Sequence, residues 1–251
     1  MGISAALLFA LAALPFSPPA QAPTDQDYRK ALGHFRAGME ALQTEHFEQA
    51  EEEFTAATRL DPDFDAAFYG LGQVHMRTHQ YERAVRDYVA CREAYTRATA
   101  AEAMGSIEAD RRLRDRIDVL RDALRSLQRA SQSSSGVSVS NSMARLNDQI
   151  RLLESRRNRG VTGSVAPVPA GVSLALGSAY FRLGQQADAE REYKAALAVD
   201  PKFGEAHSNL AVVYLVSGRY GEAQHEVDAA EKAGFKVNPK LKDEISGRSK
   251  S

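Results

Sequence analysis

The sequence predicts an all-α fold made of helix–turn–helix repeats, arranged as two pairs that a long helical hairpin separates. The repeats are predicted because small and aromatic residues recur at a spacing of 34 residues, and because Asp-Pro dipeptides separate the recurring blocks. The hairpin is predicted by two apolar seams that lie between the pairs. Self-similarity at a fixed period of this length is typical of helical repeat arrays, which present surfaces to partners.

Residues 1–22 are expected to be a secretory signal peptide. Ile3–Leu14 is an apolar run too short to cross a bilayer as a helix, and Ala20-Gln21-Ala22 is typical of a cleavage site. No Lys or Arg precedes the apolar run. We expect export to the periplasm or the exterior, with a mature chain that begins near Pro23. The alternative is an uncleaved segment that anchors the protein in a membrane.

Residues 23–98 are expected to hold repeats 1 and 2, with Thr24 or Asp25 capping the first helix. Gly38 and Gly72 stand 34 residues apart on the first helix of each unit, where a missing side chain lets the second helix approach closely. Aromatic residues at the same offset fill the remaining space. The segment 60–64 contains Pro62 and marks the turn between units, because proline ends one helix and sets the entry angle of the next.

Residues 99–169 are expected to form a coiled-coil-like helical hairpin followed by a Pro/Gly-rich linker. A Ser-rich stretch at 131–142 separates its two arms. Because the two seams would cover each other, we expect an independent module that contributes little to the repeat core. The seam residues are Leu113, Ile117, Leu120, Leu124 and Leu127 in the first arm, and Met143, Leu146, Ile150 and Leu153 in the second.

Arginine is concentrated in this hairpin. Residues 102–159 contain 12 Arg against 8 Asp plus Glu, although the whole chain has a net charge of −1. One interpretation is a solvated surface with ion pairs such as Arg114 with Asp118. A second is a basic arm that makes weak contact with an acidic partner or a membrane surface, and a third is self-association into a homo-oligomer. The net charge of the chain argues against a general nucleic-acid binder.

Residues 170–237 repeat the pattern as repeats 3 and 4. Gly177 and Ala211 are again 34 residues apart, as are Tyr193 and Val227, and Pro201 lies in the turn between the units. Residues 238–251 are expected to be a polar C-terminal tail.

No residue pattern points to catalysis, a cofactor or a metal. The only cysteine, Cys91, occupies a small-residue position of the repeat, and a disulfide within one chain is excluded. His75 and His79 are four residues apart on a predicted helix, but no third ligand is evident. Phosphate-binding glycine loops and nucleophile motifs are absent from the sequence. We therefore expect a protein that is not an enzyme and binds neither cofactor nor metal.

At these residues the sequence resembles the tetratricopeptide repeat family, with copies at about 31–64, 65–98, 170–203 and 204–237. The resemblance implies that the first helices of successive units line a concave groove for peptides or helices of partner proteins. Packing within the array is the alternative for the apolar residues of this groove. Transferred position by position, the resemblance implies a groove lined by Phe35, Met39, Leu42, Tyr69, Gln73, Met76, Arg77, Leu174, Ser178, Phe181, Arg182, Ser208, Val212 and Leu215.

The family's carboxylate clamp is matched only at Asn209, so the resemblance does not imply a receptor for chaperone C-termini. The sequence instead predicts a non-catalytic scaffold or adaptor of the cell envelope, in which Arg77 and Arg182 supply charge and Tyr69 and Phe181 supply apolar anchors. The alternative function is a self-assembling structural component that associates through the hairpin.

Overall fold

The computed structural model describes residues 23–103, 107–131 and 167–248, together with residues 143, 146–147, 150–151, 153–154 and 157. Within this part of the chain all regular structure is helical and no strand is present. The predicted signal peptide at 1–22 lies outside the described residues. None of the described helices is both long enough and apolar enough to cross a membrane.

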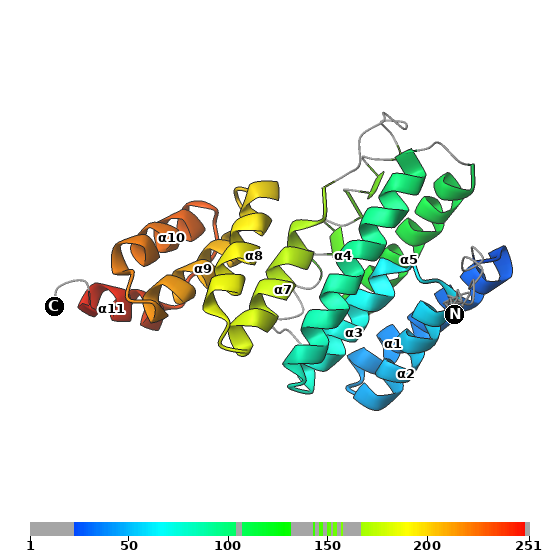
Figure 1. Ribbon diagram of the computed structural model, residues 1–251, viewed down its shortest axis with the longest axis horizontal. Helices are drawn as coiled ribbons and strands as arrows, with labels where there is room; N and C mark the ends of the chain where they lie inside the picture. Colours follow the sequence, from blue (N-terminus) through cyan, green and yellow to red (C-terminus); the bar gives the residue numbers. More distant parts are fainter. Residues whose placement is uncertain are drawn as a thin grey trace, which may run out of the picture.

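Four helix pairs follow one another along the long axis of the molecule, which confirms the predicted all-α repeat fold (Figure 1). Each pair is called a unit below. Unit 1 is α1 (Asp25–Gln43) with α2 (Phe47–Leu60), and unit 2 is α3 (Asp65–Arg77) with α4 (Tyr81–Ala103). Unit 3 is α7 (Ala170–Arg182) with α8 (Gln186–Val199), and unit 4 is α9 (Gly204–Val216) with α10 (Tyr220–Lys232).

The two helices of a unit approach closely where the sequence places its recurring glycines. A Cβ atom added at Gly72 would lie 2.4 Å from the ring of Tyr88, and one added at Gly177 would lie 2.8 Å from the ring of Tyr193. Gly38 has the same relation to the aromatic residue of unit 1. The aromatic side chains therefore fill the space that these glycines leave open.

Side-chain caps set the start of the array and the turns between its units. Thr24, rather than Asp25, caps α1, because its hydroxyl accepts the Asp27 N–H at 3.2 Å while the Asp27 carboxylate accepts the Thr24 N–H. In the turns after units 1 and 3, Asp61 and Asp200 each accept the backbone N–H two residues later at 3.0 Å. The equal geometry of these turns keeps successive units in phase.

A carboxylate occupies the same position on the second helix of every unit. In units 1, 2 and 4 it contacts a histidine of the same unit, and in unit 3 it contacts an arginine of unit 2. The pairs are Glu53 with His34 at 2.7 Å, Asp87 with His75 at 2.5 Å, Glu226 with His207 at 2.6 Å, and Glu192 with Arg92 at 3.1 Å.

Units 2 and 3 stack directly on each other, although 66 residues separate their helices in the sequence. The Glu192 side chain is 5% exposed at this junction, where both of its oxygens accept from Arg92. The four units therefore form one continuous stack, and the insertion leaves it after α4 and rejoins it at α7. The buried apolar residues of the junction are Ala84, Tyr88, Leu176 and Ala179.

The first arm of the hairpin is α5 (Ile107–Ser131), which contacts α1 and α4. Among the described residues, Leu113, Ile117 and Leu120 of the first seam form a cluster with Ile150 and Leu153 of the second. The seam residues thus pair with each other as expected, but α5 also contributes one residue to the repeat core. Val119, on another face of α5, is 3% exposed and belongs to the buried cluster of unit 1.

The segment after unit 4 contains α11 (Pro239–Arg248), which packs on α10. Ile245 of α11 and Val237 before it are buried in the core of units 3 and 4. A terminal helix with a mostly polar exposed face is a common cap of helical repeat arrays. Most of the segment expected to be a polar tail is thus helical and covers the end of the stack.

Candidate partner-binding surface

The first helices of the units, α1, α3, α7 and α9, carry all 14 residues that the sequence assigned to a partner-binding groove. We call the surface that these helices form the first-helix face. It is hollowed into a chamber of about 620 Å³. The predicted residues that line this chamber are Phe35, Met39, Leu42, Tyr69, Gln73, Met76, Arg77, Leu174 and Ser178. The other predicted residues, which do not line it, are Phe181, Arg182, Ser208, Val212 and Leu215.

The hairpin covers this chamber. Leu120 and Leu127 of α5, together with Leu146 and Leu153 of the returning arm, form the wall opposite the first-helix face. The resemblance implies a concave groove on the first helices, and in the structure residues of the hairpin line the same space. No sequence pattern indicated this arrangement, because the residues of α5 that face the repeats include Arg112 and Arg116, which are typical of a solvated surface.

Several apolar residues of the predicted groove pack within the array. The ring of Phe35 lies 5.7 Å from that of Phe54 and 5.0 Å from that of Phe64, and its side chain is 3% exposed. Tyr69 lies 5.4 Å from the ring of Tyr88, and Leu174 is buried in the core of units 3 and 4. These residues hold the floor of the chamber in place and present only part of their surface to it.

The two arginines predicted to supply charge to the groove, Arg77 and Arg182, have different surroundings. Arg77 forms an ion pair with Glu45, and its guanidinium lies 5.4 Å from the centre of the Phe47 ring, so it connects units 1 and 2. Arg182 is exposed at the end of α7. Ser178 donates to the carbonyl of Leu174 at 2.9 Å, which leaves its hydroxyl oriented along its own helix.

Ion pairs connect α5 to the first-helix face. Arg116 pairs with Asp65, the first residue of α3, and its guanidinium lies 5.6 Å from the centre of the Tyr95 ring. The Asp65 side chain is 6% exposed and that of Arg116 is 14% exposed. A carboxylate at this depth needs a cation, because a buried and unpaired charge is strongly unfavourable. The pair therefore fixes the position of α5 along α3.

Arg112, one turn earlier on α5, holds the N-terminal end of α1. Its guanidinium donates to the carbonyl of Pro23 at 3.2 Å and lies 5.3 Å from the centre of the Tyr28 ring, while its carbonyl accepts from the Tyr28 hydroxyl at 3.2 Å. Burial raises the pKa of Tyr28, so its hydroxyl stays protonated and remains a donor. Arg111 pairs in addition with Asp25 of α1.

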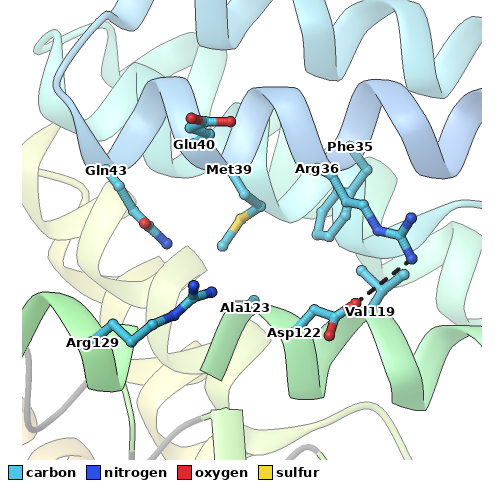
Figure 2. Close-up of a pocket in the computed structure, with 9 residues that line it drawn as sticks. All are labelled: Phe35, Arg36, Met39, Glu40, Gln43, Val119, Asp122, Ala123 and Arg129. Atoms are coloured by element: carbon cyan, nitrogen blue, oxygen red, sulfur yellow. Dashed lines mark ion pairs between the residues drawn. The ribbon is translucent and has the colours of Figure 1, made fainter. Parts of the chain in front are cut away.

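A second, smaller pocket of about 360 Å³ lies between α1 and α5 (Figure 2). Met39 points from α1 toward α5, beside Ala123 and Arg129. At one side of this pocket Arg36 and Asp122 form an ion pair of 3.7 Å. The pocket shows that α1 and α5 leave space between them from Val119 to Arg129.

The arginines of α5 form more ion pairs within the chain than the sequence indicated, and one predicted pair is wrong. Arg114 pairs with Asp110 at 3.1 Å instead of with Asp118, which pairs with Arg121. Arg121 also reaches Glu154 of the returning arm at 2.5 Å. These contacts favour the interpretation of a surface laced with ion pairs over that of a free basic arm.

Among the described residues, no group of three or more His, Cys, Asp or Glu side chains is placed to hold a metal ion. The Nδ1 atoms of His75 and His79 bind different partners, Asp87 at 2.5 Å and the Tyr81 hydroxyl at 2.7 Å. Cys91 is fully buried, and burial raises the pKa of its thiol well above the ordinary value. A thiol in this environment stays protonated and is a poor nucleophile.

Models of known families match both halves of the array. A tetratricopeptide repeat model matches residues 35–102, and a second TPR repeat model matches residues 177–218. No curated protein sequence matches the chain.

Similar solved structures include a thermophilic TPR protein from Thermus thermophilus, which is 20% identical with a TM-score of 0.36 over 88% of this chain and 100% of that one. PilW, described as a widely conserved type IV pilus biogenesis factor, is 15% identical with a TM-score of 0.41 over 87% of this chain and 86% of that one. The two models and the helix pairs of the structure agree that the chain contains tetratricopeptide-like repeats, at residues 35–102 and 177–218.

Proposed function

We propose that this protein is a non-catalytic scaffold that binds a segment of a partner protein in the chamber of the first-helix face. The observation that carries the proposal is the chamber itself, whose lining comes from residues of all four units and from the hairpin. Its volume of about 620 Å³ lies within the roughly 300–1,000 Å³ that is typical of concave binding sites in proteins.

The chemistry of the chamber suits a mostly apolar segment with a few polar groups. Apolar and aromatic side chains supply most of its walls, while Gln73, Ser178 and Glu205 are among the residues that supply groups for hydrogen bonds. Interfaces of this kind draw most of their binding energy from a few apolar anchors and gain orientation from the polar groups. The exposed Arg182 lies on the same helix as Ser178 and extends this surface toward unit 4.

A substitution that fills the chamber tests this proposal. Gln73 is half-buried on α3, so Gln73→Trp should occupy part of the space and abolish capture of the partner from extracts of the source cells. Glu82 is exposed on α4, and Glu82→Trp adds the same side chain outside the chamber, so capture should be retained. Equal capture by both variants, at equal melting temperature, would refute binding in the chamber.

The self-assembling function remains the second candidate. The seam that could mediate assembly is already covered within the chain, since Ile117 and Leu120 contact Ile150 and Leu153. This contact favours the scaffold function. Light scattering on the protein with and without residues 102–159 distinguishes the two, because a structural component would lose its assembled state with the hairpin.

We further propose that the protein is exported and works in the cell envelope. The support is the apolar run Ile3–Leu14 and the small residues Ala20 and Ala22 that follow it. Mass spectrometry of the mature protein should find an N-terminus at or near Pro23. An intact Met1 on a membrane-bound chain would favour the anchored alternative.

A further inference from the structure

The helix α5 lies on the first-helix face as a bound helical ligand would. It runs parallel to α1, since its contacts advance in the same direction on both helices. Arg112 meets Pro23 and Tyr28 near the start of α1, and Asp122 meets Arg36 further along. The repeats therefore already hold one amphipathic helix on this face.

The residues that α5 turns toward the repeats form a single stripe. Arg112, Arg116, Val119 and Ala123 follow one another at spacings of four, three and four, which places them on one face of a helix. Val119 is buried in the core of unit 1, and Ala123 is 8% exposed. The stripe thus has a basic half and a half of small apolar residues, and it is separate from the seam that meets the returning arm.

The repeats present a complementary site for each half of this stripe. The basic half meets the buried carboxylate of Asp65 and the ring of Tyr95, which together surround the Arg116 guanidinium. Both residues belong to unit 2, and both line the chamber. The apolar half meets Phe35 and Met39 of unit 1. A buried carboxylate beside an aromatic ring is a specific site for a guanidinium, because an arginine satisfies its charge and also packs on the ring.

We propose that units 1 and 2 are a receptor for an arginine-bearing amphipathic helix, that α5 is the resident ligand of this receptor, and that a partner helix with the same stripe competes with α5. The proposal rests on the proposed function and specifies it further: the partner segment takes the place of α5 and contacts the part of the chamber that the first-helix face lines. The required stripe is an arginine followed by small apolar residues three and seven positions later. Such a partner gains access only when it displaces α5, so the hairpin limits binding to helices that reproduce its contacts.

A peptide of residues 107–131 serves as the probe, and its binding to the full-length protein is measured by fluorescence anisotropy. Arg116→Glu in the protein places a carboxylate against Asp65 and should release α5, so this variant should bind the peptide at least roughly tenfold more tightly than the wild type does. Asp65→Asn in the same variant removes the receptor carboxylate and should reverse this gain. A peptide that itself carries Arg116→Glu should bind neither of these two variants more tightly than it binds the wild-type protein.

Circular dichroism melting establishes that each variant is folded, and Arg116→Gln, which removes the charge without adding repulsion, should show a smaller gain in the same direction. Equal peptide affinity of wild type and both Arg116 variants would overturn the proposal, as would equal binding of the two peptides. Either result would still be compatible with partner binding in the chamber if Gln73→Trp abolished partner capture. Conversely, peptide binding without partner capture would support the receptor and count against the proposed function.

Discussion

Single atoms decide how closely the helices of a unit approach. Gly177 faces the ring of Tyr193 at a distance that leaves no room for a methyl group, whereas a Cβ at Gly171, on the same helix, would meet nothing within 4 Å. The sequence period identifies Gly177 as a repeat position because another small residue, Ala211, stands 34 residues later. The sequence period does not identify Gly171 as a repeat position.

Gly177→Ala should lower the free energy of unfolding by about 1–3 kcal/mol, because the added methyl must displace the Tyr193 ring. Gly171→Ala should leave stability equal or raise it by up to about 1 kcal/mol, since alanine favours a helix. Urea denaturation of the two variants checks this pair. Equal destabilisation at both positions would show that helix propensity, and not the ring contact, governs these sites.

The buried His75 should make stability depend on pH. Burial lowers the pKa of His75, but its hydrogen bond to Asp87 and the charges of Asp87 and Glu51 outweigh this effect and raise the pKa above its ordinary value of 6.5. Glu51 is also paired with Arg83. A raised pKa in the folded state contributes stability that is fully present below the unfolded pKa and is lost as the pH rises through the folded pKa.

We therefore expect the free energy of unfolding to fall as the pH rises from about 6.5, and His75→Gln to flatten this dependence. Urea denaturation at a series of pH values measures both slopes. His46→Gln is the control, because His46 is exposed before α2 and its side chain bonds the Thr44 hydroxyl at 2.8 Å instead of a carboxylate. An unchanged slope in His75→Gln would show that another group titrates.

At the scale of elements, the repeat helices were predictable and the placement of α5 was not. Residues such as Gly72 and Tyr88 recur because they touch within one unit, so their contact leaves a pattern in the sequence. The contacts of α5 leave no such pattern. Arg116 meets Asp65 across 51 residues of sequence, and a stripe of two arginines, a valine and an alanine resembles a solvated surface. For the same reason the sequence could place the proposed groove residues on the first helices of the units, but it could not place the hairpin beside them.

Val119→Ala tests whether α5 belongs to the repeat core. The valine is 3% exposed in the cluster of unit 1, so its truncation should cost about 1–3 kcal/mol and lower the melting temperature of the whole array. Val216→Ala removes the same atoms from a side chain that is 55% exposed and should change stability by less than about 0.5 kcal/mol. If the Val119→Ala protein melts at the same temperature as the wild type, that result would support the prediction that the hairpin is an independent module.

At the scale of the whole molecule, the junction of units 2 and 3 makes one array from two repeat pairs. Arg92→Ala would leave the Glu192 carboxylate buried without its cation. The expected cost is about 1–3 kcal/mol, below that of a fully buried pair, because Arg92 is 36% exposed. Arg191→Ala breaks the exposed pair with Asp188 and should cost at most about 1 kcal/mol. Urea unfolding followed by circular dichroism measures both, and equal losses would contradict a special role of the junction.

The direct stacking of α4 on α7 also means that the covalent connection between the halves is dispensable for their recognition. A chain cut between the two arms of the hairpin yields an N-terminal fragment with α1 to α5 and a C-terminal fragment with α7 to α11. These fragments keep complementary surfaces at the junction, at Arg92 and Glu192, and at the seam. Co-expressed, they should co-elute as a reconstituted molecule, so the insertion is a natural place at which to split this protein into a complementation pair.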